Sequence, residues 1–273
     1  MFIDRTIAQL LVILDRTGPA VVAKSDGVPF TWENSANTAA VRFGIPGITE
    51  PAVFAVPLGK SHVSIATVSA NHDTLAFRFL LLNRKLYEAL GDPFQIADAF
   101  PPEWSARGAL PLLEWLEKPL PARNVLELQT MLKENDGPLL LGATQALLDG
   151  SRILIQRDAP ADALLRQLWQ LLPTKSRCEI WPATFAGNAD LGFQIAVLPS
   201  LPDKLPMGYI TEEQTRDYPE GRYELSLQSA IESGNQFELD RLLARRSSQE
   251  TLRLALGMLV GALVLALVSK LLF

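Results

Sequence analysis

A short apolar run of the chain ends in Gly59-Lys60-Ser61, which is also how a phosphate-binding loop of the Walker A type ends. Such a loop needs a further glycine, separated from the Gly-Lys pair by four residues, and a helix after it whose N-terminal amides hold the phosphates. Phe54 occupies that glycine position, and the residues after Ser61 have the pattern of a strand. We therefore predict a hairpin turn at residues 57–60 and no phosphate site.

Histidine and cysteine are the side chains most often used for metal binding and nucleophilic catalysis, and the chain has only three of them. His62 and His72 have only Asp73 as an adjacent carboxylate, and adjacent residues of a strand point in opposite directions. Basic residues just before Cys178 would lower its thiol pKa, but a single cysteine in a strand is usually a small structural residue. We expect no catalytic residue, no metal site and no cofactor.

The segment from residue 181 to residue 193 has two glycines among small residues and predicts a tight loop between two strands. One interpretation is a recognition loop that displays Thr184, Asn188 and Asp190. The other, which we favour, is a shaped loop that packs its two phenylalanines into the core. The sequence alone leaves both interpretations open.

The elements that must position these residues differ between the two halves of the chain. Up to residue 90, short runs rich in Val, Ile, Leu and Phe predict strands, and Gly, Pro, Asn and Asp separate them. The predicted strands are residues 9–14, 20–24, 52–56, 63–68 and 75–82, followed by a helix over 83–90. Residues 91–122 are rich in proline and carry two tryptophans, which predicts an ordered loop across the core.

From residue 123 the hydrophobic pattern alternates between helical and strand-like segments, which predicts a mixed α/β core. The predicted helices are residues 124–134, 139–148, 161–172, 222–233 and 236–246, and the predicted strands are 152–156, 178–181 and 193–198. We expect a cytoplasmic α/β domain over residues 1–200, then a loop and two juxtamembrane helices over 201–250.

The C-terminal segment predicts a transmembrane helix. Residues 254–269 contain no charge and are apolar on every helical face, whereas a helix docked on a protein core should show a polar stripe. The long side chains of Arg253 and Lys270 can reach the interfaces, so a span over residues 251–273 covers about 34 Å. The chain is therefore expected to be a tail-anchored protein.

Flanking charge predicts the orientation of this anchor, because positive residues stay on the cytoplasmic side and also attract anionic lipids. The basic residues before the uncharged stretch 254–269 are Arg241, Arg245, Arg246 and Arg253. Only Lys270 follows this stretch, so the N-terminal part is placed in the cytoplasm, at the inner membrane. Gly257 and Gly261 form a G-x-x-x-G pattern that lets two helices pair into a homodimer, the alternative being a monomeric anchor.

Composition excludes some classes of partner. The net charge of −5 gives the surface no electrostatic reason to bind nucleic acid. The single cysteine excludes an internal disulfide framework and suits a reducing compartment. We therefore expect the lipid bilayer and an unidentified protein as partners.

The order of short motifs between residues 86 and 185 resembles that of a known family. These motifs are Leu-Tyr87-Glu-Ala-Leu-Gly-Asp92-Pro-Phe, Phe100-Pro-Pro-Glu-Trp104, Leu-Leu-Gly142-Ala, Leu-Leu-Asp149-Gly150, Leu-Trp169-Gln-Leu-Leu-Pro173-x-x-x-Arg177 and Trp181-Pro-Ala-Thr-Phe. They resemble the N-terminal domain of bacterial GTPase-associated proteins, which occur in conflict and signalling systems. The likeness covers residues 5–200 and carries no catalytic motif. The whole chain also looks like a bacterial family with the same membrane anchor.

This resemblance implies an adaptor or regulatory role beside a nucleotide-dependent partner. We expect a membrane-tethered cytoplasmic module that binds a protein partner, linked to a GTPase or NTPase system. The alternative is a membrane-anchored, hydrolase-like enzyme with an unrecognised active site. A deep pocket that contains His62 or Cys178 would favour that alternative.

Overall fold

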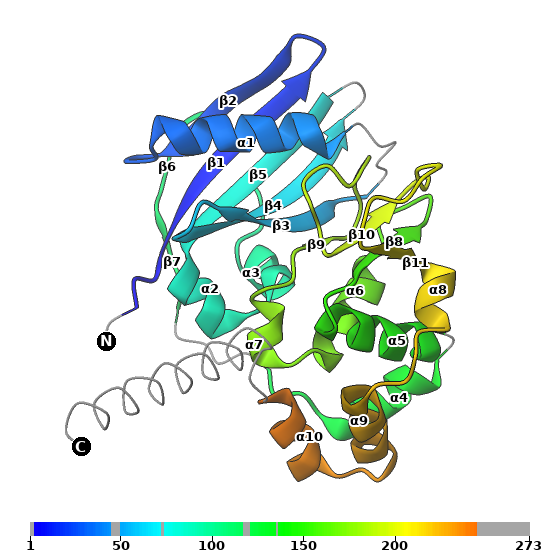
Figure 1. Cartoon of the computed structure of the whole chain (residues 1–273). Coiled ribbons are helices and arrows are strands. Elements are labelled where there is room, and N and C mark those ends of the chain that lie inside the picture. The colour runs from blue at the N-terminus through cyan, green and yellow to red at the C-terminus, as the bar shows by residue number, and fades with distance from the viewer. Residues whose placement is uncertain (1–2, 45–49, 72–73, 117–120, 135, 245–273) are drawn as a thin grey trace, which may run out of the picture.

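The computed structural model of the chain describes residues 3–44, 50–71, 74–116, 121–134 and 136–244. In this part the chain folds around one large mixed sheet with helices on both faces (Figure 1). The strands follow the order β11-β8-β10-β9-β3-β4-β5-β1-β2-β6, and β7 pairs with β1. The predicted mixed α and β fold is confirmed at this level.

The N-terminal half of the sheet is an antiparallel layer. Its elements are β1 (Thr6–Asp15), β2 (Gly18–Ser25), α1 (Phe30–Phe43), β3 (Ala52–Leu58), β4 (His62–Asn71) and β5 (Thr74–Asn83). The five strands predicted in this half are confirmed. The sequence does not predict α1, because the side that the helix buries consists mainly of alanines: Ala36, Ala39 and Ala40.

The predicted hairpin turn is also confirmed, with one correction. Leu58 pairs with His62, and the turn between them passes through Gly59 at a positive φ of 65°. Pro57, which the sequence places in the turn, instead pairs with Val63 inside β3.

A proline is tolerated at this place because its nitrogen points away from the sheet. The main chain of Val53 bonds outward to Thr184, and main-chain groups two and four residues along a strand point to the same side. Pro57 therefore directs its nitrogen past the end of β9, where no ladder bond is lost.

The rest of the chain supplies the other strands and most of the helices. Its elements are α2 (Arg84–Leu90), α3 (Pro93–Ala99), β6 (Gly108–Leu110), β7 (Leu113–Glu114), α4 (Val125–Lys133), α5 (Gly137–Leu148), β8 (Arg152–Gln156), α6 (Asp162–Leu171), α7 (Thr174–Arg177), β9 (Pro182–Ala183), β10 (Ile195–Leu198), β11 (Tyr209–Thr211), α8 (Glu212–Arg216), α9 (Arg222–Glu232) and α10 (Gln236–Leu243). The helices predicted in this half are confirmed, except that the last two residues of the helix predicted over 236–246 lie outside the described residues. Strand β11 lies beyond residue 200, yet it joins the same sheet beside β8.

The strand predicted over residues 178–181 is wrong. Helix α7 occupies residues 174–177, and Cys178 continues its last turn in right-handed helical geometry. The turn begins at Pro173, whose carbonyl accepts a hydrogen bond from the Arg177 N–H at 3.1 Å. Burial of Arg177 and Cys178 against the neighbouring helices outweighs the local strand pattern.

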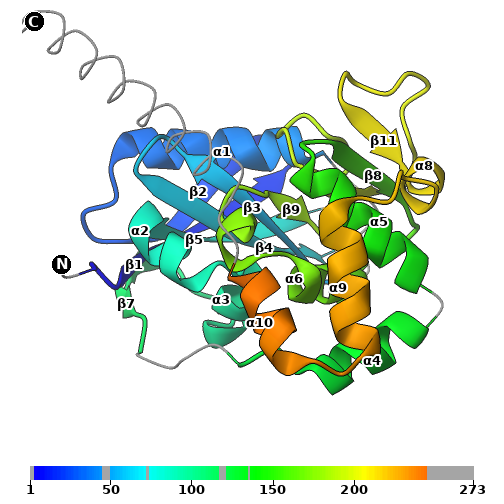
Figure 2. The ribbon, with the colours of Figure 1, turned by 60° about the horizontal axis from the view of Figure 1, so that its bottom comes forward.

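Figure 1 shows α1 on one side of the N-terminal strands and α2 and α3 on the other, and Figure 2 shows the same helices turned by 60°. Phe43 of α1 stacks on Phe54 of β3, with 5.1 Å between the ring centroids, and meets the edge of Phe77 of β5. Phe193, from the C-terminal half, meets the edge of Phe54 at 5.8 Å. One aromatic cluster therefore continues from α1 through the sheet into the second half of the chain.

The proline-rich segment is fastened to the sheet by a buried arginine. Arg78 is only 5% exposed and donates hydrogen bonds to the Phe100 carbonyl at 2.5 Å and to the Gln9 side chain at 2.6 Å. Gln9 in turn donates to the Pro111 carbonyl at 2.6 Å. Burial lowers the pKa of Arg78 to about 10, and neutral oxygens bind the guanidinium in place of a carboxylate.

Candidate functional site

The loop after β9 is fastened to the sheet by its first residue. Thr184 is fully buried; its N–H donates to the Val53 carbonyl and its hydroxyl accepts from the Val53 N–H, both at 2.8 Å. The predicted recognition residue Thr184 therefore holds the two halves of the sheet together instead of facing solvent.

The middle of the loop is pressed against the end of α1. The Gly187 N–H donates to the Phe43 carbonyl at 2.8 Å, and a Cβ atom on Gly187 would lie 3.0 Å from the Cα of Gly44. Only glycine allows this approach. The two phenylalanines of the segment, Phe185 and Phe193, are fully buried, as the packing interpretation requires.

Asn188 and Asp190 lie at the surface, where the loop borders an open cleft of about 490 Å³. The Asn188 side-chain oxygen accepts a hydrogen bond from the Asp190 N–H at 2.8 Å, which shapes the loop as an Asx-turn. We call this cavity the Arg152 cleft; its main lining residues are Arg152, Asn188, Asp190, Ser200, Leu201 and Tyr209.

Arg152, which the sequence does not single out, provides the positive charge of this cleft. Its guanidinium carbon lies 5.5 Å from the centroid of the Tyr209 ring, in cation–π contact. The ring is fixed because the Tyr209 hydroxyl donates to the Phe193 carbonyl at 2.7 Å. Within the described ranges, the Arg152 side chain has no hydrogen bond or ion pair, so its charge is held in place and open to an anion.

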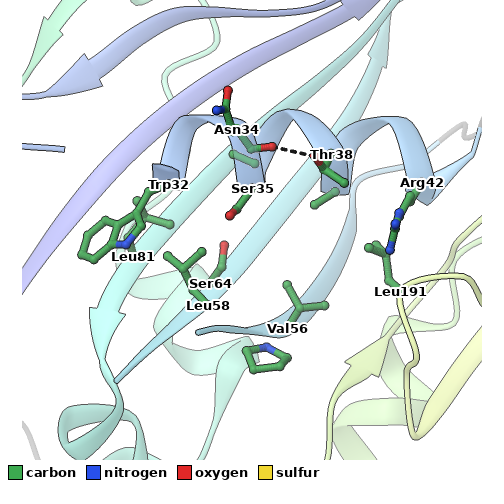
Figure 3. Close-up of a pocket in the computed structure, with 13 residues that line it drawn as sticks. Trp32, Asn34, Ser35, Thr38, Arg42, Val56, Leu58, Ser64, Leu81 and Leu191 are labelled. Carbon is green, nitrogen blue, oxygen red and sulfur yellow. Dashed lines mark hydrogen bonds between the residues drawn. The ribbon is translucent and has the colours of Figure 1, made fainter. Parts of the chain in front are cut away.

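The same loop borders a second cavity on its other side, drawn in Figure 3. This groove of about 340 Å³ lies between α1 and β3, and Leu191 of the loop lines its end. One short loop therefore separates two cavities.

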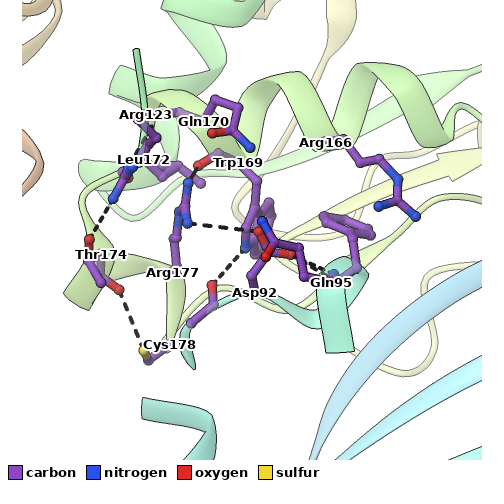
Figure 4. Close-up of polar contacts among 12 residues, drawn as sticks. Asp92, Gln95, Arg123, Arg166, Trp169, Gln170, Leu172, Thr174, Arg177 and Cys178 are labelled. Atoms are coloured by element: carbon purple, nitrogen blue, oxygen red, sulfur yellow. Dashed lines mark hydrogen bonds and ion pairs between the residues drawn. The ribbon is translucent and has the colours of Figure 1, made fainter. Parts of the chain in front are cut away.

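Cys178, considered above as a nucleophile, is buried against α2, and Figure 4 shows its contact with Thr174. Its sulfur lies 3.5 Å from the carbonyl oxygens of Thr174 and Glu88. Burial raises the pKa of the Cys178 thiol to about 12, which is the opposite of what a nucleophile needs.

His62 lies elsewhere, with its ring centroid 4.4 Å from that of Trp32 on α1. Burial lowers the pKa of His62. The contacts of His62 and Cys178 do not bring the two side chains together, and His72 lies outside the described residues.

Beside Cys178, buried charges connect several helices (Figure 4). Arg177 donates to the Trp169 carbonyl and lies 3.9 Å from the Asp92 carboxylate, which caps α3. Arg123 donates to the Thr174 hydroxyl at 2.5 Å. Burial lowers the pKa of Arg177 and raises the pKa of Asp92. Because these groups bind one another and the backbone, we interpret them as structural ties.

Within residues 3–44, 50–71, 74–116, 121–134 and 136–244, no group of three His, Cys, Asp or Glu side chains is placed to hold a metal ion. None of the helices in these ranges combines the length and the apolar character that a membrane crossing requires.

The predicted anchor over residues 251–273, with Gly257 and Gly261, lies outside the described residues. So do the basic residues Arg245, Arg246 and Arg253. Arg241 lies on α10, where it is exposed and forms an ion pair with Glu238.

No family model matches the chain, and no curated protein matches it. The resemblance to GTPase-associated proteins therefore stays a hypothesis, and function is inferred from the residues of the site.

Thr184 is buried in the sheet contact and Asp190 is exposed, so substitutions at these two positions should lower the free energy of unfolding by different amounts. Thr184→Val keeps the side-chain volume but leaves the buried Val53 N–H without an acceptor, so the free energy of unfolding should fall by about 1–3 kcal/mol. Asp190→Ala, at an exposed position of the same loop, should change it by less than about 0.5 kcal/mol. Urea unfolding of both variants measures this, and equal costs would contradict a structural role for Thr184.

The raised pKa of Cys178 predicts an unreactive thiol. At pH 8, about one in ten thousand thiols with a pKa of about 12 is ionised, so the folded chain should resist Ellman's reagent. The same chain in guanidinium chloride should react completely within minutes, and it serves as the control. Rapid labelling of the folded chain would show that Cys178 is accessible and ionised after all.

Proposed function

We propose that this chain is an adaptor or regulatory module that binds a protein partner through the Arg152 cleft. One observation carries the proposal: a guanidinium stacked on a fixed tyrosine ring, with no carboxylate from the described residues bound to it, lines an open cleft. Such a charge has already lost much of its freedom of movement, so a carboxylate that binds it has less ordering entropy to overcome.

The composition of the cleft fits a protein partner. Arginine, tyrosine and methionine are enriched at protein interfaces, and the cleft combines Arg152 and Tyr209 with the nearby Met207, whose side chain is fully exposed. The walls are loops set on a rigid sheet, which is a common arrangement for recognition. Leu201 adds apolar contact, and Asn188 adds an amide for hydrogen bonding.

We further propose that residues 251–273 anchor the module in the inner membrane, with residues 1–250 in the cytoplasm. Tethering raises the effective concentration of two proteins that share one membrane. Pairing through Gly257 and Gly261 would add a second copy of the cleft. The motif order discussed above supports a partner from a GTPase or NTPase system.

The alternative, a membrane-anchored hydrolase, would be favoured by a deep pocket around His62 or Cys178. The burial of Cys178 and its raised thiol pKa give that reading no support.

The anchor predicts a simple fractionation result. After alkaline carbonate extraction, the full-length chain should stay in the membrane pellet because residues 254–269 carry no charge. A chain that ends at residue 250 should move to the supernatant. Recovery of the full-length chain in the supernatant would contradict the anchor while leaving the cleft untouched.

The cleft predicts a partner that can be captured by crosslinking. A photo-crosslinking amino acid at Met207, in the full-length chain in its own cells, should produce a defined adduct with another protein. Adding Arg152→Ala should reduce this adduct about tenfold, because a buried or half-buried charge pair contributes about 1–3 kcal/mol.

The control is Lys85→Ala, which removes an exposed cation on α2, on the far side of the sheet from α1. This variant should leave the adduct unchanged. Absence of any adduct from Met207, or an adduct that survives Arg152→Ala at full yield, would rule out partner binding at this cleft.

A further inference from the structure

The groove between α1 and β3 has the form of a second binding site. Its floor is a row of cross-strand neighbours, in which Val56 pairs with Ser64 and Ser64 pairs with Leu81. Helix α1 forms one wall with a helical face that runs from Trp32 to Arg42 (Figure 3). We call this cavity of about 340 Å³ the Ser64 groove.

A polar atom without a partner lies in the middle of this floor. Ser64 is only 4% exposed, and Figure 3 shows its hydroxyl pointing towards α1. The nearby Ser35 hydroxyl donates to the Thr31 carbonyl at 2.9 Å. Among the residues that the structure describes, none forms a hydrogen bond with the Ser64 hydroxyl. The Ser64 oxygen is not one of the buried side-chain atoms that lack both a partner and access to water, so it faces the groove, where a ligand atom can bond to it in place of water.

The two ends of the groove differ in chemistry. Trp32 and Leu58 make one end apolar. At the other end, the guanidinium of Arg42 points towards Leu191 and, within the described ranges, forms no ion pair or hydrogen bond. A ligand that fits both ends therefore has an apolar body and one terminal negative charge.

The cationic end is also closed. The loop after β9 crosses the end of α1, where Gly187 donates to the Phe43 carbonyl and approaches Gly44, and Leu191 lies against Arg42. A polypeptide that ran through the groove would meet this loop. A chain end would instead stop there, with its terminal group beside Arg42.

Beyond its single pair with β9, the edge of β3 is unpaired among the described residues, and Pro57 at this edge also lines the groove. Pro57 points its main chain outward at this edge, and proline has a carbonyl oxygen but no N–H. The edge therefore offers hydrogen-bond acceptors, which match the N–H groups of an extended peptide. A hydrocarbon chain would leave both these acceptors and the Ser64 hydroxyl unpaired.

We infer that the Ser64 groove binds the C-terminal segment of another protein, with an apolar last side chain over the floor and the terminal carboxylate at Arg42. The distance along α1 from Trp32 to Arg42 is about 15 Å, which accommodates roughly four extended residues. This site is separate from the Arg152 cleft and does not depend on the partner proposed there.

The inference is tested with two peptide libraries and the full-length chain in a mild detergent. Both contain octapeptides that end in Leu, Ile, Val or Phe; one has free carboxylates and the other has carboxamide ends. The chain should retain the carboxylate library at least about fivefold better, because the carboxamide end cannot pair with the Arg42 charge. Equal retention of the two libraries, or retention of neither, would overturn the inference.

Two variants locate the site. Arg42→Gln should remove the preference for carboxylates, whereas Lys85→Gln, at an exposed cation on α2, should keep it. Ser64→Ala should weaken peptide binding about three- to tenfold while leaving the melting temperature nearly unchanged, since the hydroxyl faces the groove and bonds to no described residue of the chain. A purely structural Ser64 would give the opposite pattern, with lower stability and unchanged binding.

Other occupants would give distinct results. If a peptide copy of residues 266–273 is retained far better than every library member, the groove takes the end of its own chain and the assignment to another protein fails. If dodecanoate binds and neither library does, the groove is a lipid site and the inference also fails.

Discussion

The whole arrangement depends on the contact between β3 and β9, where the two halves of the sheet meet. Strand β9 contributes only one paired residue, Ala183, opposite Phe54. Thr184 extends the contact with two hydrogen bonds to Val53, and Phe193 packs on Phe54 from the second half. Because this contact fixes the loop after β9 between α1 and β8, it also fixes the positions of both cavities. A shift of one residue here would turn Thr184 away from Val53 and displace Asn188, Asp190 and Leu191, through which the loop lines both cavities.

Apart from the arginines that form ion pairs with carboxylates, two sets of arginines among the described residues differ in what binds them. Arg78, Arg123 and Arg177 lie in the interior and bind mainly carbonyl and side-chain oxygens, which connect the proline-rich segment and the helices to the sheet. Burial lowers their pKa values, to about 10 for Arg78 and about 9 for Arg123, and their hydrogen bonds compensate for that burial. Arg152 and Arg42 line cavities and, in the described part of the chain, lack such partners. This contrast separates structural cations from cations that await a ligand.

The sequence predicts the strands and amphipathic helices well because their hydrophobic periods are clear, but it fails where burial is decided by distant residues. Helix α1 buries alanines, which give no strong period. The segment around Cys178 has a strand-like composition, yet contacts with α2 and α6 make it a helical turn. The glycines of the loop after β9 predict a tight loop, and this pattern identifies Asn188 and Asp190 as candidate surface residues. No sequence pattern reveals that Arg152 or Ser64 lacks a partner, because that property depends on which residues the fold leaves out of reach.

The open edge beside the Ser64 groove follows from two prolines. In the register of the β3–β9 pair, Pro182 lies opposite Ala55, and the Pro182 nitrogen points towards β3 as the Thr184 nitrogen does. Pro182 has no N–H to give, so the ladder between β9 and β3 stops there. Pro57, two residues beyond Ala55, also lacks an N–H that could bond to an approaching strand. An edge that lacks outward N–H groups resists pairing with a full strand from another molecule, and such pairing is the usual hazard of an exposed edge. It still accepts hydrogen bonds from a short segment that supplies its own donors, so the same two residues that protect the edge also determine which ligand can use it.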